Sequence, residues 1–196
     1  MLENDRQPDM KLDKDSLNKY KLTEDEFKLT KSSYFSQTLK ANEFFLQEGE
    51  VCNYIGFVTK GILRAYIFDD FANEITTEFY PEGSLIISFD SFNNQIPSKE
   101  NIRAVEDSEL MVISFEKQKE LYRLVPTWNQ ICKDLADSIS KEMKERTRLF
   151  QTMTATERYI DFRKKHPDIL QRVTLGCIAS YLGVDIATLS RIRKKV

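Results

Sequence analysis

The sequence predicts an α+β protein: an N-terminal antiparallel β-roll of jelly-roll type, then a long helix, then a C-terminal helix-turn-helix. Three observations predict this order. Short apolar runs separated by turn-forming groups fill residues 44–113, apolar residues recur at helical spacing after Ser114, and residues 174–195 have the pattern of two short helices joined by a tight turn.

The β-roll domain is expected at residues 22–125. Residues 1–21 are polar and lack periodicity, which predicts a mobile arm. Thr23 and Glu26 have the spacing of a capping box, so a short helix should precede the first strand. Closely spaced strands without intervening helices are typical of an antiparallel roll, and we expect them at 44–46, 54–59, 62–68, 75–80, 84–89, 101–105 and 109–113.

A short helix at 115–124 and a long helix from about Thr127 to Gln151 follow, with Pro126 in a position that the first helical turn tolerates. The long helix has an apolar stripe that packs either on its own β-roll or on a second copy of the chain. Charged residues occupy most of its other faces, which favours a homodimer and a dimerisation helix at 126–152. The expected interface residues are Trp128, Ile131, Leu135, Ile139, Met143 and Phe150.

The helix-turn-helix is the strongest signal in the sequence, within a domain expected at 153–196. A second capping box at Thr154 and Glu157 starts that domain. Thr174 can cap the first helix of the pair, Gly183 permits a left-handed turn, and Asp185 can cap the second helix. Such a helical hairpin either has a purely structural role or binds nucleic acid.

The distribution of charge along the chain favours nucleic-acid binding. Residues 141–196 contain 13 Lys and Arg against 6 Asp and Glu, whereas the rest of the chain contains 16 against 25. On the second helix Arg191 suits guanine, Ile186 and Ala187 suit thymine methyls, and the remaining polar residues suit phosphates. The predicted contacts to double-stranded DNA are Thr174, Asp185, Ile186, Ala187, Thr188, Ser190, Arg191, Arg193, Lys194 and Lys195.

The order of these elements resembles the Crp/Fnr superfamily of bacterial transcription regulators, from about residue 22 to the end. The resemblance rests on Gln47-Glu48-Gly49-Glu50, Gly61, Pro81-Glu82-Gly83-Ser84, Val105-Glu106-Asp107-Ser108-Glu109-Leu110, Thr156-Glu157-Arg158-Tyr159 and Leu189-Ser190-Arg191-Ile192-Arg193-Lys194-Lys195. It implies a cyclic-nucleotide-binding-type β-roll, dimerisation through the long helix, a winged-helix-like DNA-binding domain and regulation of promoters, with RNA polymerase as a further candidate partner.

The sequence departs from that family at two sites. Ser98 and Lys99 stand where cyclic-AMP-binding members place a phosphate-binding Arg and its hydroxyl partner, so cyclic AMP is not expected to bind, although Arg103 lies nearby. Ile186 and Ala187 stand where well-known members place Arg and Glu, so the operator should differ. An unidentified effector could bind a pocket formed by Phe79, Phe89, Phe92, Ser98, Lys99 and Arg103, or the aromatic residues could be core.

Other function classes find little support. A single histidine, His166, cannot build a metal-dependent enzyme site or a catalytic triad, so we expect no enzyme activity and no metal. Cys52, Cys132 and Cys177 are scattered, which indicates neither an iron-sulfur cofactor nor a disulfide framework. Neither a signal peptide nor a membrane span is apparent, which predicts a cytoplasmic protein. The remaining alternative is a β-roll that serves only for dimerisation or protein contacts.

Overall fold

The computed structural model describes residues 19–196, and its strands form two four-stranded antiparallel sheets. The first sheet has the order β1 (Phe35–Leu39), β8 (Ser108–Ser114), β3 (Tyr54–Lys60) and β6 (Leu85–Ile86). The second has the order β2 (Phe44–Leu46), β7 (Asn101–Ala104), β4 (Leu63–Phe68) and β5 (Glu74–Tyr80). The predicted β-roll is confirmed.

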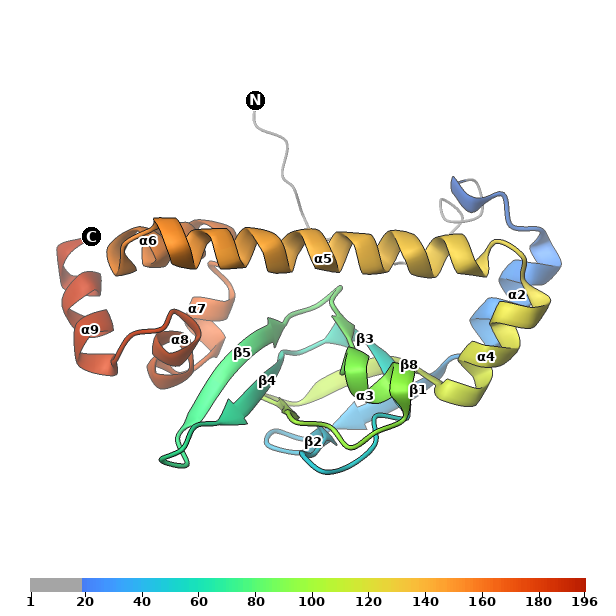
Figure 1. Ribbon diagram of the computed structural model, residues 1–196, viewed down its shortest axis with the longest axis horizontal. Helices are drawn as coiled ribbons and strands as arrows, with labels where there is room; N and C mark the ends of the chain where they lie inside the picture. The colour runs from blue at the N-terminus through green and yellow to red at the C-terminus, as the bar shows by residue number, and fades with distance from the viewer. Residues whose placement is uncertain (1–18) are drawn as a thin grey trace.

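Helices lie over the roll and, at the C-terminal end of the chain, beside it (Figure 1). Helix α5 crosses the whole molecule above the sheets, with α2 and α4 at one end and the last four helices at the other (Figure 1). Their bounds are α2 (Glu24–Ser32), α3 (Phe89–Asn94), α4 (Phe115–Leu124), α5 (Trp128–Thr152), α6 (Ala155–Lys165), α7 (Ile169–Arg172), α8 (Leu175–Tyr181) and α9 (Ile186–Lys195). This order confirms the predicted α+β fold class. Apart from its last three residues, the arm expected at 1–21 lies outside the described residues.

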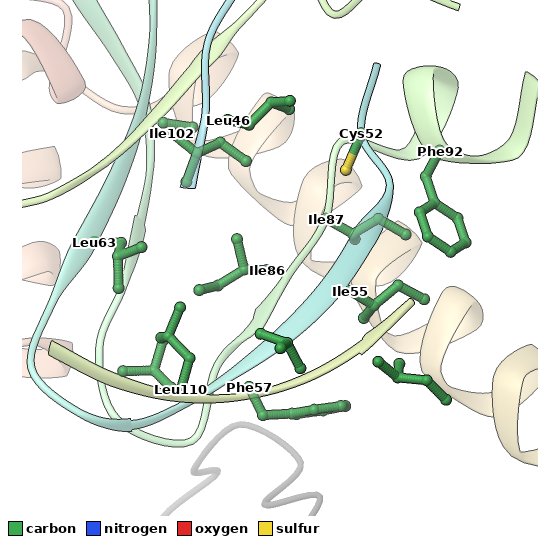
Figure 2. Packing of buried hydrophobic residues seen from close by; sticks show 14 of the residues in the cluster. Leu46, Cys52, Ile55, Phe57, Leu63, Ile86, Ile87, Phe92, Ile102 and Leu110 are labelled. Atoms are coloured by element: carbon green, nitrogen blue, oxygen red, sulfur yellow. The ribbon is translucent and has the colours of Figure 1, made fainter. Parts of the chain in front are cut away.

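The core of the roll consists of aliphatic side chains that point inward from both sheets (Figure 2). Leu63, Ile86, Ile102 and Leu110 are at most 1% exposed, and burial of one such side chain contributes about 1.5–3 kcal/mol. The turn between β3 and β4 requires Gly61, because its φ is +95° and a Cβ there would lie 2.8 Å from the Ser108 Cα. The alternating apolar pattern of the sequence and this glycine turn together produce the strand pairs that shape the roll.

Two elements differ from the sequence prediction. Strand β1 was not expected, since it lies at a sheet edge, pairs only with β8 and buries little more than Leu39. The strand expected at 84–89 is paired only over Leu85–Ile86, after which the chain turns into α3. Ser91 stabilises that turn, because its hydroxyl accepts from the Cys52 backbone N–H at 2.8 Å and donates to the Ile96 carbonyl.

Helix α5 packs on the roll of its own chain along its N-terminal half. Trp128 and Ile131, at 1% and 3% exposed, belong to the roll's core cluster, and Leu135 packs against that cluster. The prediction that Trp128 and Ile131 form a dimer interface is therefore corrected: their side chains are already covered within one chain. An apolar stripe shows that a helix face is buried, but not which surface buries it.

Candidate nucleic-acid interface

Helices α8 and α9 form the predicted helix-turn-helix, and the residues singled out in the sequence make its local contacts. The Thr174 hydroxyl caps α8 by accepting from the Cys177 N–H, and the Asp185 carboxylate caps α9 by accepting from the Thr188 N–H at 2.7 Å. Gly183 has a φ of +66°, which turns the chain between the two helices. The Val184 N–H then donates to the Ala179 carbonyl at 3.0 Å and closes the turn.

One face of α9 is buried and the opposite face is open. Leu189 and Ile192 are buried in the C-terminal core. Ala187, Arg191 and Lys194 are exposed and Ser190 is half-buried, and their spacing places all four opposite Leu189 and Ile192. Of the ten predicted DNA contacts, none is buried, and Ile186 at the start of α9 is 54% exposed.

Arg191 is held in position from within its own helix. The Thr188 hydroxyl donates to the Asp185 carboxylate at 2.8 Å and accepts from an Arg191 guanidinium N–H at 3.0 Å. The hydrogen bonds from the Thr188 backbone N–H and then from its hydroxyl lower the pKa of Asp185, and the Arg191 charge lowers it a little further. The Asp185 carboxylate thus holds Thr188, and Thr188 in turn holds the Arg191 guanidinium.

The helix-turn-helix is docked on its own β-roll. Ile62 and Phe79 of the roll share a hydrophobic cluster with Phe162 and Ile178 of the C-terminal helices. The Ser180 hydroxyl on α8 donates to the Thr76 hydroxyl on β5 at 2.9 Å and accepts from the Thr76 N–H. Helix α8 therefore packs against β5, beside which it lies in Figure 1, and the position of α9 depends on the roll.

Arg172 adds an ion-pair cluster to this docking. Its guanidinium binds the Glu82 carboxylate through two bonds of 2.6 and 2.9 Å and also contacts the Glu106 carboxylate. Hydrogen bonding to Arg172 lowers the pKa of Glu82 from 4.5 to about 2, and the two carboxylates raise the pKa of Arg172. Both acids belong to the motifs that resemble the Crp/Fnr family, but sequence alone gave no sign of their partner.

Replacing Arg172 with Met should loosen the docking and lower the free energy of unfolding by roughly 1 kcal/mol, since the pairs are partly exposed. The folded pKa of Glu82 lies below its ordinary value, so its stabilisation is complete above about pH 4.5 and disappears as the pH falls toward about 2. Urea unfolding of both proteins across this range measures the difference. A difference that persists undiminished at about pH 2 would contradict the assignment.

Two further arginines, which the sequence analysis did not single out for these contacts, join the helices. Arg158 on α6 donates to the Leu182 carbonyl at 2.9 and 3.1 Å and so fixes the end of α8. Arg146 on α5 contacts the Thr77 carbonyl, the Glu78 carboxylate and the Tyr181 carbonyl, and its guanidinium lies 4.0 Å from the centroid of the Tyr181 ring. The hydrogen-bond partners of Arg146 and Arg158 are 5 to 69 residues away in sequence. Most of these partners are backbone carbonyls, which every residue has, so the sequence does not indicate them.

A cavity of about 600 Å³ lies between the roll and α5. Four of the predicted pocket residues line it, namely Phe79, Phe89, Ser98 and Lys99. Phe92 and Arg103 are not among its lining residues. Phe92 is buried edge-on against Phe115, whereas Arg103 lies over the Tyr66 ring and pairs with Glu74 at 3.4 Å.

The C-terminal half of the α5 stripe is more open than its N-terminal half. Met143 is 63% exposed and Ile139 is half-buried, and both lie at the cavity. Phe150 is 40% exposed but lies 4.8 Å from the Arg158 guanidinium and next to Gly183, where its ring would be 2.9 Å from an added Cβ. Of the six predicted interface residues, Met143 and Phe150 thus have the largest exposed fractions, but the Phe150 ring is already packed against Arg158 and Gly183, which leaves Met143 and its neighbour Ile139 as the open part of the stripe.

Among the described helices, none by itself has the length and apolar composition to cross a membrane, and only α8 and α9 taken together pass that test, with a 96° bend between them. Within residues 19–196, His, Cys, Asp and Glu side chains do not gather in groups of three or more that could hold a metal ion.

Comparison with known proteins gives a domain match and a fold match. The family model of the cyclic nucleotide-binding domain matches residues 36–124. No curated protein sequence matches significantly.

Similar solved structures cover most of the chain. The c-di-GMP-responsive regulator CLP of Xanthomonas campestris has 15% identity and a TM-score of 0.70, over 88% of this chain and 91% of that one. FixK2 of Bradyrhizobium japonicum has 16% identity and a TM-score of 0.68, over 83% of each chain. A structure from Eubacterium rectale assigned to the crp/fnr family of transcriptional regulators has 18% identity and a TM-score of 0.70, over 91% and 85%. Residues 36–124 therefore form a cyclic-nucleotide-binding-type domain, and the chain has the fold of the Crp/Fnr transcription regulators.

Proposed function

We propose that the protein is a cytoplasmic, sequence-specific DNA-binding transcription regulator that acts as a homodimer and does not respond to cyclic AMP. The observation that supports DNA binding is the open face of α9, where Arg191 and Lys194 extend from a helix whose other face is anchored by Leu189 and Ile192. A helix presented in this way fits the major groove, and an arginine can donate two parallel hydrogen bonds to guanine.

The dimer is supported by the exposed part of α5. Met143 and Ile139 lie on the same helix as the small, exposed residues Ala136 and Ser140, which let a second helix approach closely. A twofold axis along α5 would present two copies of α9 to half-sites about 34 Å apart, one turn of DNA. The preferred operator is then a palindrome.

The lack of a cyclic AMP response is supported by the composition of the cavity. The cyclic phosphate needs a guanidinium with free donors, and the arginine on the cavity wall, Arg146, is already engaged by Glu78 and by two backbone carbonyls. Ser98 is buried and Lys99 is exposed, so neither replaces that group.

Selection of bound sequences from random duplex DNA tests this function, with the purified full chain at near-physiological salt and no added ligand. The expected result is a palindromic consensus. Addition of cyclic AMP should leave the consensus and the affinity unchanged. Weak binding to all sequences alike would overturn the proposal.

Replacing Arg191 with Ala should weaken binding to the selected operator by about 1–3 kcal/mol and relax the preference at one base position in each half-site. Replacing Lys194 with Ala should weaken operator and random DNA equally and reduce the salt dependence, since a phosphate contact does not read sequence. Fluorescence anisotropy at several salt concentrations separates the two effects. Equal losses on operator and random DNA for Arg191→Ala would exclude its role as a base reader.

A further inference from the structure

The charges around the cavity between the roll and α5 are predominantly acidic. Its lining includes the acids Glu78, Asp90, Glu100 and Glu142 and the bases Lys99 and Arg146. Arg146 is occupied by protein groups, and Lys99 is exposed. An anionic ligand would therefore enter a site where carboxylates outnumber the available cations, and would be repelled by them.

The four acids differ in their partners, and the Glu100 carboxylate accepts a hydrogen bond from the Ser88 side chain. Glu78 faces Arg146 at 3.6 Å, and Asp90 accepts from the Asn94 side chain at 2.7 Å. Glu100 and Glu142, in contrast, have no ion-pair partner within residues 19–196. Burial raises the pKa of both carboxyl groups, and the hydrogen bond from Ser88 offsets part of the rise at Glu100. Glu100 is half-buried in the cavity wall, whereas the Glu142 side chain is exposed at its rim.

The rest of the lining is apolar or hydroxylic. Phe57, Tyr80, Leu85 and Ile87 line the inner part, with Phe89 toward the exposed side. Buried Ser88 and Ser98 contribute hydroxyl oxygens that lie 3.4 Å apart. Ser98 exchanges hydrogen bonds with the Glu100 backbone, and Ser88 bonds the Glu100 carboxylate, so the two serines hold Glu100 in place. The volume of about 600 Å³ suits a small organic molecule, and aromatic rings attract a cation that is partly desolvated.

We propose that this cavity binds an organic cation, an amine on an apolar body, with Glu100 and Glu142 as its counter-ions. The ammonium group lies toward the carboxylates and the serine hydroxyls, and the apolar body lies against Phe57, Tyr80 and Phe89. This ligand class is opposite in charge to a cyclic nucleotide. The inference does not depend on DNA binding, and its test contains no DNA, so its failure would leave the proposed regulator function standing.

Isothermal titration calorimetry with the full chain at neutral pH tests the proposal with three probes of equal shape and different charge: 3-phenylpropylamine, 3-phenylpropanol and 3-phenylpropanoate. The amine should bind about tenfold or more tightly than the alcohol, and the carboxylate should not bind, because the ion pair is available to the amine alone. Cyclic AMP is the anionic reference. Tighter binding of either anion, equal binding of amine and alcohol, or no binding of the amine at millimolar concentration would overturn the proposal.

Substitutions then locate the counter-ions. Glu100→Gln and Glu142→Gln should each weaken amine binding about tenfold and leave alcohol binding unchanged, because the shape is kept and the charge is removed. The matched control is Glu145→Gln, also on α5, whose carboxylate is exposed and paired with Arg148. It should leave both affinities at the wild-type level. Wild-type amine affinity in both cavity variants would overturn the assignment.

Discussion

Replacing Trp128 with Ala is expected to lower the free energy of unfolding by about 3–5 kcal/mol, the cost of removing a large aromatic side chain from a packed core. Trp128 is 1% exposed and joins the first turn of α5 to the core of the roll. Since stabilities of small domains are typically about 5–15 kcal/mol, this loss would be a large fraction of the stability of the roll. Urea unfolding followed by circular dichroism measures the loss without relying on the single tryptophan.

This substitution also distinguishes core packing from a dimer interface. If Trp128 acts within one chain, the destabilisation is the same at low and high protein concentration, whereas an interface residue would show a loss that depends on concentration. The matched control is Leu124→Ala at the end of α4, where the side chain is 53% exposed and the change should cost less than about 1 kcal/mol. If the loss of unfolding free energy for Trp128→Ala depends on protein concentration, Trp128 lies in a dimer interface.

Replacing Met143 with Asp is expected to raise the dissociation constant of the proposed dimer by about 100-fold or more. A twofold interface would bring two new carboxylates together, and like charges in contact across an interface cost several kcal/mol. Specific DNA affinity should fall with it, because a monomer reads a single half-site. Sedimentation velocity gives the dimer constant, and anisotropy with the selected operator gives the DNA affinity.

The matched control for this change is Lys141→Asp. Lys141 is exposed on the same helix, two residues earlier and about 160° away around the axis, so an acid there avoids both the roll and the proposed interface. It should leave the dimer intact. An unchanged dissociation constant for Met143→Asp would mean that α5 does not mediate dimerisation through this residue.

The helix-turn-helix could be predicted from sequence because short-range chemistry determines its limits. Thr174, Gly183 and Asp185 act on backbone groups within a few residues of themselves. The capping boxes at Thr23 and Thr154 formed for the same reason. Where a side chain bonds only to backbone groups in the adjacent turn of helix, residue type and spacing are enough to predict the contact.

The cavity and the domain contacts could be predicted only in part, because they depend on partners far away in the chain. The prediction placed Phe92 and Arg103 with Phe89 and Ser98, but strand pairing directs Arg103 to Glu74, and α3 turns Phe92 into the core. The acids Glu100 and Glu142 were missed, since they come together only when α5 folds back over the roll. Similarly, an apolar stripe could not tell Trp128, which packs on its own roll, from Met143, which stays exposed.

The position of Arg146 has a consequence for how the two halves of the protein communicate. One guanidinium contacts Glu78 at the cavity wall and the Tyr181 carbonyl at the end of α8, so the cavity and the helix-turn-helix share a side chain. A molecule in the cavity that competes for Glu78 would change the support of α8, and with it the free energy of DNA binding. Thermodynamic linkage makes that exchange symmetric. The operator would then shift the affinity of the cavity by the same factor, so DNA itself would act as an effector of the sensor.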